Sequence, residues 1–398
     1  DFFLRQKEKL SGRSDLYSYF YALSLAVLNP GGIHVFICSN TWLDIESGVW
    51  LKKLMTTEHD LVAVIDNSAS KSFERADVNT VITVTKSGPN PEPSNVVFTS
   101  LRVPFSELHN SKVIADQLGL GRSSKTPLHK TTVTSISNSE DGSVLTLKPE
   151  DSWGGKYLRT PELLDDLVAL AEGKLAPLGE VASIASYVHD NLTGSNYPET
   201  YFVKSVKDTD SIWLDHQSSG VRKYGVATSG TTRRIGQLLI PRTFGLDHRV
   251  LVNMGGVTAK EFYRVYIAPE LVTTLAIAMN STFAILQREV VASAGLGGGA
   301  LKLAKDSVGK FLVPNSRVET PSEVSDEFLK RKTLPISREL GFPDDSWDGE
   351  QSIELVPKDR AAVDRALFHH LGIDEKFLFP LYQITAEMVM QRDSKAQS

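Results

Sequence analysis

Hydrophobic positions between residues 14 and 87 follow a helical spacing in two places and form short apolar runs in three others. Strands buried on both faces carry apolar residues without alternation, so strands are predicted at 33–38, 61–65 and 78–85. Helices are predicted after Ser14, a suitable N-cap, and over 42–55. The predicted apolar face of the first helix holds Leu16, Phe20, Leu23, Ala26 and Val27. The alternation predicts an α/β domain with a mainly parallel sheet.

Beyond residue 87 the pattern becomes less regular. A stretch rich in Pro, Ser and Asn at 88–93 marks the edge of the first sheet, and short β-type runs continue to residue 148. Residues 175–315 alternate β-rich segments with one long helix over 271–291. Further helices are predicted at 161–172, 360–371 and 375–391. The chain is therefore expected to divide into three parts: 1–150, 151–320 and 321–398.

Net charge gives no global reason to expect a nucleic acid partner, because the 398 residues carry a formal charge of -5. One segment departs from this balance. Between Gln217 and Arg264 eight Lys or Arg stand against two acids, a formal net charge of +6. Gly, Ser, Thr and Tyr lie among these cations, as suits loops that approach phosphates and base edges. The alternative is an ordinary solvated basic face.

A single cysteine, Cys38, lies inside an apolar run. It forms no intrachain disulfide, and no cluster of Cys and His predicts a metal site, so we expect none. No stretch approaches the ~20 apolar residues of a membrane span. These features fit a protein of the reducing cytoplasm. The chain opens Asp-Phe-Phe-Leu-Arg in the middle of a pattern, so we expect it to be a fragment, or a chain whose upstream half lies elsewhere.

Three segments carry a resemblance. Residues 14–32, then Ser-Asn-Thr-Trp-Leu at 39–43, then Ser-Phe-Glu-Arg-Ala-Asp-Val-Asn-Thr at 72–80 occur in this order. Together they resemble the late motifs of SAM-dependent adenine-N6 DNA methyltransferases of the type II restriction–modification family. The resemblance implies the C-terminal part of a Rossmann-like SAM-methyltransferase sheet, followed by an α+β target-recognition domain and a helical tail.

The resemblance also implies a base pocket. In that family a loop between the last two strands places an aromatic residue against the extruded adenine, and Phe73 occupies the matching position. A flipped base needs apolar or aromatic walls to offset its lost stacking. The alternative for Phe73 is that it plugs the end of the sheet. Asn40 follows a strand at the end where open α/β sheets place ligands, although it is also suited to cap a helix near Trp42.

Two family motifs are missing from the sequence: the glycine-rich SAM-binding turn and the Asn-Pro-Pro-aromatic tetrapeptide. The tetrapeptide holds the target amino group, so the resemblance implies that this chain has no catalytic residue of its own. S-adenosyl-L-methionine would be bound mainly by an upstream methyltransferase half or a partner subunit. No nuclease centre is found either, so any cleavage would reside in another polypeptide.

A second block resembles the opening of target-recognition domains. Residues 178–184 are followed by Asn-Leu-Thr-Gly-Ser-Asn at 191–196, and later by Gly-Gly-Gly-Ala-Leu-Lys at 297–302. The glycines at 295–299 follow a helix rather than a strand, which disfavours nucleotide binding there. The expected partner is double-stranded DNA. The candidate DNA-binding residues are Thr193, Gly194, Asn196, Arg222, Lys223, Arg233, Arg234, Arg242 and Lys302.

The sequence therefore favours sequence-specific DNA recognition and adenine-N6 methylation within a restriction–modification or phage-defence system. An alternative function is a non-catalytic DNA specificity module that docks onto a separate methyltransferase or nuclease. A third is a degenerate methyltransferase fold that serves only as a scaffold, which would show no salt-dependent DNA binding.

Overall fold

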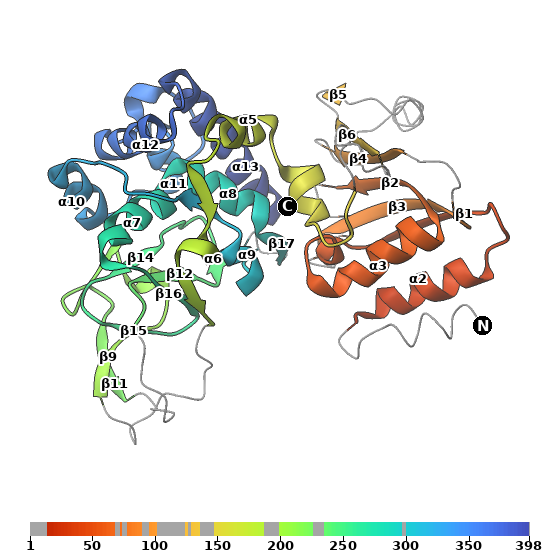
Figure 1. The fold of residues 1–398 in the computed structure, drawn as a ribbon, viewed down its shortest axis with the longest axis horizontal. Coiled ribbons are helices and arrows are strands. Elements are labelled where there is room, and N and C mark those ends of the chain that lie inside the picture. Colours follow the sequence, from red (N-terminus) through yellow and green to blue (C-terminus); the bar gives the residue numbers. More distant parts are fainter. Residues whose placement is uncertain are drawn as a thin grey trace. The chain divides into compact units, whose positions relative to one another are not determined.

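The computed structural model describes residues 14–67, 72–73, 78–89, 95–101, 124–125, 129–135, 147–186, 199–225, 235–296 and 300–397 (Figure 1). The chain folds into two compact units. Unit 1 comprises Asp1–Thr160, Ser293–Gly299 and Gln391–Ser398, and unit 2 comprises Pro161–Ala292 and Ala300–Met390. The division into three functional parts stays a prediction.

Unit 1 contains a six-stranded mixed sheet with the order β1-β3-β2-β4-β6-β5. Its strands are β1 (Ile33–Ser39), β2 (Asp60–Asp66), β3 (Thr80–Lys86), β4 (Asn95–Leu101), β5 (Ser124–Lys125) and β6 (His129–Ser135). The α/β class is confirmed, and the three predicted strands are β1, β2 and β3. The expectation of a mainly parallel sheet is wrong. Among the described strands of this sheet only β2 and β4 pair in parallel, because β3 returns antiparallel between β1 and β2.

The first helix, α2 (Leu16–Val27), turns a different face to the sheet from the one predicted. Its buried residues include Tyr21, Ala22 and Leu25, and the Tyr21 hydroxyl bonds the Thr83 hydroxyl of β3 at 2.7 Å. Four of the five predicted core positions are exposed: Leu16, Phe20, Leu23 and Val27. Helical spacing identified one apolar stripe of α2, but the helix carries two, and the other stripe is the one that packs on the sheet. The N-cap is Asp15, whose carboxylate accepts from Leu16 N, and not Ser14.

The predicted helix over 42–55 is broken into short pieces. These are η1 (Asn40–Leu43), η2 (Glu46–Gly48), α3 (Val49–Lys53) and η3 (Leu54–Glu58). The break has a steric cause, because a Cβ at Gly48 would lie 1.9 Å from the Trp42 carbonyl oxygen. The chain therefore folds back on itself at a distance that only glycine permits. The buried Trp42 packs edge-on against Trp153, which precedes η5 (Gly154–Arg159).

Unit 2 is built around a five-stranded sheet with the order β10-β14-β12-β16-β8. A second set, β9, β11 and β15, forms a separate three-stranded sheet, and two further pairs join β13 to β18 and β19 to β7. The strands are β7 (Leu175–Pro177), β8 (Ser183–Ala185), β9 (Glu199–Val203), β10 (Trp213–Leu214), β11 (Arg222–Gly225), β12 (Leu238–Pro241), β13 (Thr243–Phe244), β14 (Leu251–Asn253), β15 (Thr258–Ala259), β16 (Phe262–Tyr266), β18 (Ala300–Lys302) and β19 (Leu312–Pro314). One more short strand, β17 (Ser293–Leu296), belongs to unit 1.

The helices of unit 2 include a buried pair that replaces the predicted long helix over 271–291. It breaks at Ser281, whose side chain caps the second helix by accepting from Ala284 N. Asp364 also accepts from Thr282 N and Thr282 Oγ1, at 2.9 and 2.7 Å. The helices are α5 (Glu162–Leu170), α6 (Leu178–Val181), η7 (Val206–Asp208), η8 (Pro269–Leu271), α7 (Val272–Asn280), α8 (Thr282–Val291), α9 (Lys305–Gly309), α10 (Ser322–Lys330), α11 (Ile336–Glu339), η9 (Ile353–Leu355), α12 (Lys358–Leu371), η10 (Glu375–Phe377) and α13 (Leu378–Gln397). The predicted helices at 161–172, 360–371 and 375–391 are confirmed in α5, α12 and α13.

Within the described ranges, no single helix has the length and apolar composition needed to cross a membrane. Two consecutive segments, Pro269–Asn280 and Thr282–Val291, reach that length and apolar composition only when taken together, and the chain bends by 67° between them.

Candidate functional site

Polar side chains gather at one edge of the unit 1 sheet. The strands β1 and β2 both end there and β3 begins there, since Ser39 lies opposite Thr80 and Asp66 opposite Val81. Asn40 follows β1, and its Nδ2 donates to Asp66 Oδ1 at 3.3 Å, while its main-chain N donates to Asn79 O at 2.9 Å. The helix cap near Trp42 is instead Ser39, whose hydroxyl accepts from Thr41 N. The Asn40 side chain is thus directed along the sheet edge.

The aromatic candidate is anchored to the same edge. Asn67 Nδ2 donates to Ser72 Oγ at 3.1 Å, and the Ser72 hydroxyl bonds the Thr80 hydroxyl. Both Asn67 and Thr80 are buried, so Ser72 is tied to the strand ends. Its neighbour Phe73 keeps 48% of its surface exposed. The result is an exposed aromatic ring beside a largely buried cluster of amide, carboxylate and hydroxyl groups.

This cluster was only partly foreseen. The sequence indicated Asn40 and Phe73, whereas Asp66, Asn67 and Thr80 were missed. A signal was available, because Asp66-Asn67 directly follows an apolar strand run in the same way that Asn40 does. An exposed ring with hydrogen-bonding groups beside it is suited to hold a planar heterocycle.

A two-stranded ribbon in unit 2 carries the first pair of DNA-binding candidates. Strands β9 and β11 pair antiparallel, so Arg222 lies opposite Phe202 and Tyr224 opposite Thr200. In Figure 1 the ribbon extends away from the other described elements of unit 2. Arg222 and Tyr224 are exposed on one face, and the Tyr224 ring lies 6.0 Å from that of Phe202. This face therefore presents a cation beside two aromatic rings.

The other face of the ribbon holds Lys223, whose ammonium lies 5.6 Å from the Tyr201 ring centroid. Tyr201 in turn stacks on His216 at 3.9 Å. The turn that carries His216 is fixed by Asp215. Partial burial opposes ionisation, but the hydrogen bonds from Gln217 N, Trp213 and Ser218 outweigh it and hold the pKa of Asp215 below its usual value. Tyr201 and Phe202 were not predicted, because they lie outside the basic segment at 217–264.

Arg222 is held close to the ribbon's own backbone. Its Nη1 donates to Ser219 O at 2.7 Å and to Val221 O at 3.0 Å. The residue is nevertheless solvent-exposed. Exposed main-chain contacts of this kind are exchanged for other acceptors at small cost, so the guanidinium remains able to meet a ligand.

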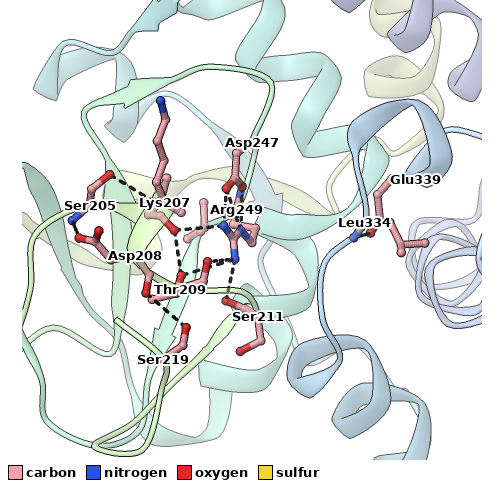
Figure 2. Close-up of polar contacts among 12 residues, drawn as sticks. Ser205, Lys207, Asp208, Thr209, Ser211, Ser219, Asp247, Arg249, Leu334 and Glu339 are labelled. Carbon is pink, nitrogen blue, oxygen red and sulfur yellow. Dashed lines mark hydrogen bonds and ion pairs between the residues drawn. The ribbon is translucent and has the colours of Figure 1, made fainter. Parts of the chain in front are cut away.

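The basic segment contains one cation that is not available to a ligand. Arg249 is buried, and its Nε donates to Asp247 Oδ1 at 2.8 Å (Figure 2). Its terminal nitrogens donate to the carbonyl oxygens of Thr209 at 2.7 Å and Val206 at 3.0 Å. Arg249 therefore stabilises the loop of unit 2 that contains Val206 and Thr209. The formal net charge of +6 includes Arg249 as part of a basic surface, and this interpretation is wrong for that residue.

The remaining candidates lie on other elements or outside the described residues. Arg242 precedes β13 and is paired with Glu261 at 3.3 Å, and Lys302 is exposed on β18, opposite Thr243. These two cations are thus on a different strand pair from Arg222 and Lys223. Five candidates lie outside the described residues: Thr193, Gly194, Asn196, Arg233 and Arg234.

The described part of the chain contains neither a candidate metal centre nor, at the junction of β1 with η1, a glycine-rich turn for S-adenosyl-L-methionine. No group of three or more His, Cys, Asp or Glu there could hold a metal ion. The connection from β1 to η1 is Ser39-Asn40 and contains no glycine, so the backbone cannot approach a cofactor as closely as a glycine-rich turn allows. No step involving the cofactor is therefore assigned to these residues.

Comparison with known proteins gives a match to one family model and matches to solved structures, two of which are described here. Two solved structures, the type IIG restriction endonuclease BpuSI and the type IIL restriction-modification enzyme MmeI in complex with DNA, align at a TM-score of 0.44 and 12% identity. The alignments cover 98% and 97% of this chain but only 50% and 55% of those chains, so the chain spans about half their length. No curated protein matches the sequence. Residues 2–73, a segment that contains β1, β2 and Phe73, match the model of the Eco57I restriction-modification methylase family.

Proposed function

We propose that the chain takes part in site-specific adenine-N6 methylation of DNA, by supplying one wall of the target-base pocket and a DNA-reading surface. The observation that carries the proposal is the position of Phe73, exposed at the strand edge within the matched methylase segment. The target adenine of such an enzyme must leave the duplex, and an aromatic wall offsets part of its lost stacking.

The residues of this chain would act by positioning. The Phe73 ring would pack against the extruded base, and Asn40 with Asp66 would offer an amide and a carboxylate to its polar edge. The adenine amino group is a poor nucleophile, so accurate placement contributes more to the rate than deprotonation. S-adenosyl-L-methionine would supply the methyl group from a site formed by other polypeptide.

The DNA-reading surface we propose is the β9–β11 ribbon, with the face that carries Arg222 and Tyr224 turned into the groove and Lys223 on its other face. The major groove of DNA, about 12 Å wide, admits a two-stranded ribbon. Arg222 would donate to a base edge, Lys223 would neutralise a phosphate, and Tyr224 would pack in the groove. This assignment separates a residue that reads sequence from one that only adds affinity.

An in vitro transfer experiment tests the reaction. The product of the complete gene is incubated with S-adenosyl-L-methionine and DNA from a host that lacks the gene, and the nucleosides are analysed by mass spectrometry. N6-methyladenine is the expected product. N4-methylcytosine or 5-methylcytosine would overturn the assignment of the base. Specific DNA binding without any methylation would favour the non-catalytic specificity module.

The ribbon assignment predicts different behaviour for its two cations. Arg222→Ala should weaken binding to the recognised site by about 10- to 100-fold and relax the sequence preference, because a direct base contact is worth ~1–3 kcal/mol. Lys223→Ala should weaken binding to all sequences alike and reduce the slope of log K against log salt by about 1. Fluorescence anisotropy over a salt series measures both. The exposed Arg317 provides the control as Arg317→Ala, and equal effects at Arg222 and Arg317 would contradict the assignment.

A further inference from the structure

His216 presents the polar edge of a well-positioned imidazole beside the ribbon. Its ring stacks on that of Tyr201, with the centroids 3.9 Å apart and the ring planes at an angle of 16°. The side chain is exposed, and neither ring nitrogen is hydrogen-bonded to a residue that the structure describes. Stacking fixes the plane of the ring, and exposure leaves its two nitrogens open to a ligand.

The turn that carries His216 is held in place on two sides. The Asp215 carboxylate accepts from Gln217 N at 2.8 Å and from Trp213 Nε1 at 3.1 Å. The connection from β14 to β15 passes so closely that a Cβ at Gly255 would lie 2.9 Å from His216 N. The main chain at His216 is therefore confined, and the neighbouring carboxylate is already engaged within the turn.

The Tyr201 ring also carries a second cationic group. Lys223 lies opposite Tyr201 in the antiparallel pair, and its ammonium lies 5.6 Å from the Tyr201 centroid. Opposite residues of an antiparallel pair share one face of the sheet, so the lysine and the stacked imidazole belong to one surface. Glu199, opposite Gly225, is an acid on the same face. Within the described ranges Lys223 forms no ion pair with it or with another acid.

The position of this face favours a phosphate over a base as its ligand. The major groove is about 8.5 Å deep, and sheets with their side chains pack about 10 Å apart. A ribbon with Arg222 and Tyr224 turned toward the bases therefore places its other face at the level of the phosphates along the rim of the groove. His216 and Lys223 lie on that other side.

We propose that His216 is a proton-linked contact to DNA, which takes up a proton and binds the phosphate backbone beside the phosphate that Lys223 neutralises. The inference rests on the proposed function, which brings DNA to the ribbon. A protonated imidazole donates from both nitrogens and a neutral one from a single nitrogen. A phosphate therefore binds the protonated form more tightly, and by reciprocity a bound phosphate favours proton uptake. DNA affinity should rise as the pH falls from about 8 to about 5.5, the range in which exposed histidines gain a proton.

The charged and titratable groups around His216 do not reverse this sign. The β14–β15 connection at Gly255 contributes none, and its own turn contributes Asp215. The ribbon contributes Tyr201, Lys223 and Glu199. The two carboxylates favour a proton on the imidazole and the ammonium opposes it, while the DNA phosphate adds a negative charge only in the complex.

Fluorescence anisotropy with the product of the complete gene and a labelled DNA duplex of mixed sequence tests the inference. Between about pH 8 and about pH 5.5 the parent protein should gain about three- to tenfold in affinity, and the slope of log K against log salt should steepen by about 1. His216→Gln keeps a polar side chain that gains no proton and should lose both changes. A pH response that persists undiminished in His216→Gln would overturn the proposal.

His369→Gln is the matched control, because His369 is also exposed but lies on α12. It should keep the pH response of the parent protein, and equal losses in the two variants would overturn the assignment to His216. Absence of DNA binding at both pH values would overturn the proposed function together with the inference. Binding that weakens in Lys223→Ala but keeps its full pH response in His216→Gln would overturn the inference alone.

Discussion

Replacing Phe73 by alanine in the product of the complete gene is expected to lower kcat/KM for DNA methylation by about 100- to 1000-fold. The ring is exposed at the strand edge and contacts no core cluster of the described residues, so its loss should change the free energy of unfolding by less than about 0.5 kcal/mol. The rate should fall because the extruded base loses its aromatic wall and with it the correct position of the amino group. Single-turnover methylation of a cognate duplex measures the effect.

A conservative variant distinguishes this role from a structural one. Phe73→Tyr retains the ring and should keep activity within about tenfold of the parent protein, whereas Phe73→Leu keeps apolar volume without a ring and should behave more like alanine. Unchanged turnover in Phe73→Ala would remove the residue from the base pocket. Loss of both stability and activity would instead favour the alternative that Phe73 plugs the end of the sheet.

Replacing the buried Arg249 should have the opposite effect to replacing Phe73. It should lower the free energy of unfolding strongly and leave the methylation reaction unchanged. Arg249→Met would leave Asp247 without its cation, and would leave the carbonyl oxygen of Thr209 without its donor. Breaking a buried ion pair by removing one partner typically costs about 3–5 kcal/mol. Urea denaturation should therefore show a loss of about 3 kcal/mol, at the lower end because the Asp247 side chain is 28% exposed.

Arg317→Ala serves as the stability control, because an exposed arginine should change the free energy of unfolding by less than about 0.5 kcal/mol. The folded fraction of Arg249→Met should bind DNA with the affinity of the parent protein. Weakened DNA binding with unchanged stability would make Arg249 a contact residue, contrary to its position in the structure.

The local hydrophobic pattern was sufficient to predict the positions of the first three strands of unit 1, but not the directions in which they run. The apolar runs that became β1, β2 and β3 were found within two residues of their bounds. Apolar composition does not record whether the next strand returns beside the previous one, so the antiparallel insertion of β3 could not be derived. The long helix expected over 271–291 failed for a similar reason. At its break Ser281 caps the second helix, and Asp364, which is distant in sequence, accepts from Thr282 N.

The second property that could not be predicted from the sequence is which residues are buried. Leu16, Phe20, Leu23 and Val27 form a stripe as regular as a core-facing one, and only the packing of Tyr21 against the sheet shows which face is inside. Arg249 looked like its basic neighbours because sequence does not show the carbonyl oxygens around it. The position of Asn40 at the end of a strand could be predicted, because it depends on one strand alone. Its contact with Asp66 depends on how two strands lie relative to each other, and could not be predicted.

Single-molecule sequencing of genomic DNA tests whether the protein takes part in sequence-specific adenine methylation. Genomes from cells that carry the complete gene are compared with genomes from cells in which it is deleted. N6-methyladenine at a single sequence motif, present only with the gene, is the predicted result. Identical methylation in the two genomes, or gene-dependent modification of cytosine, would contradict the account.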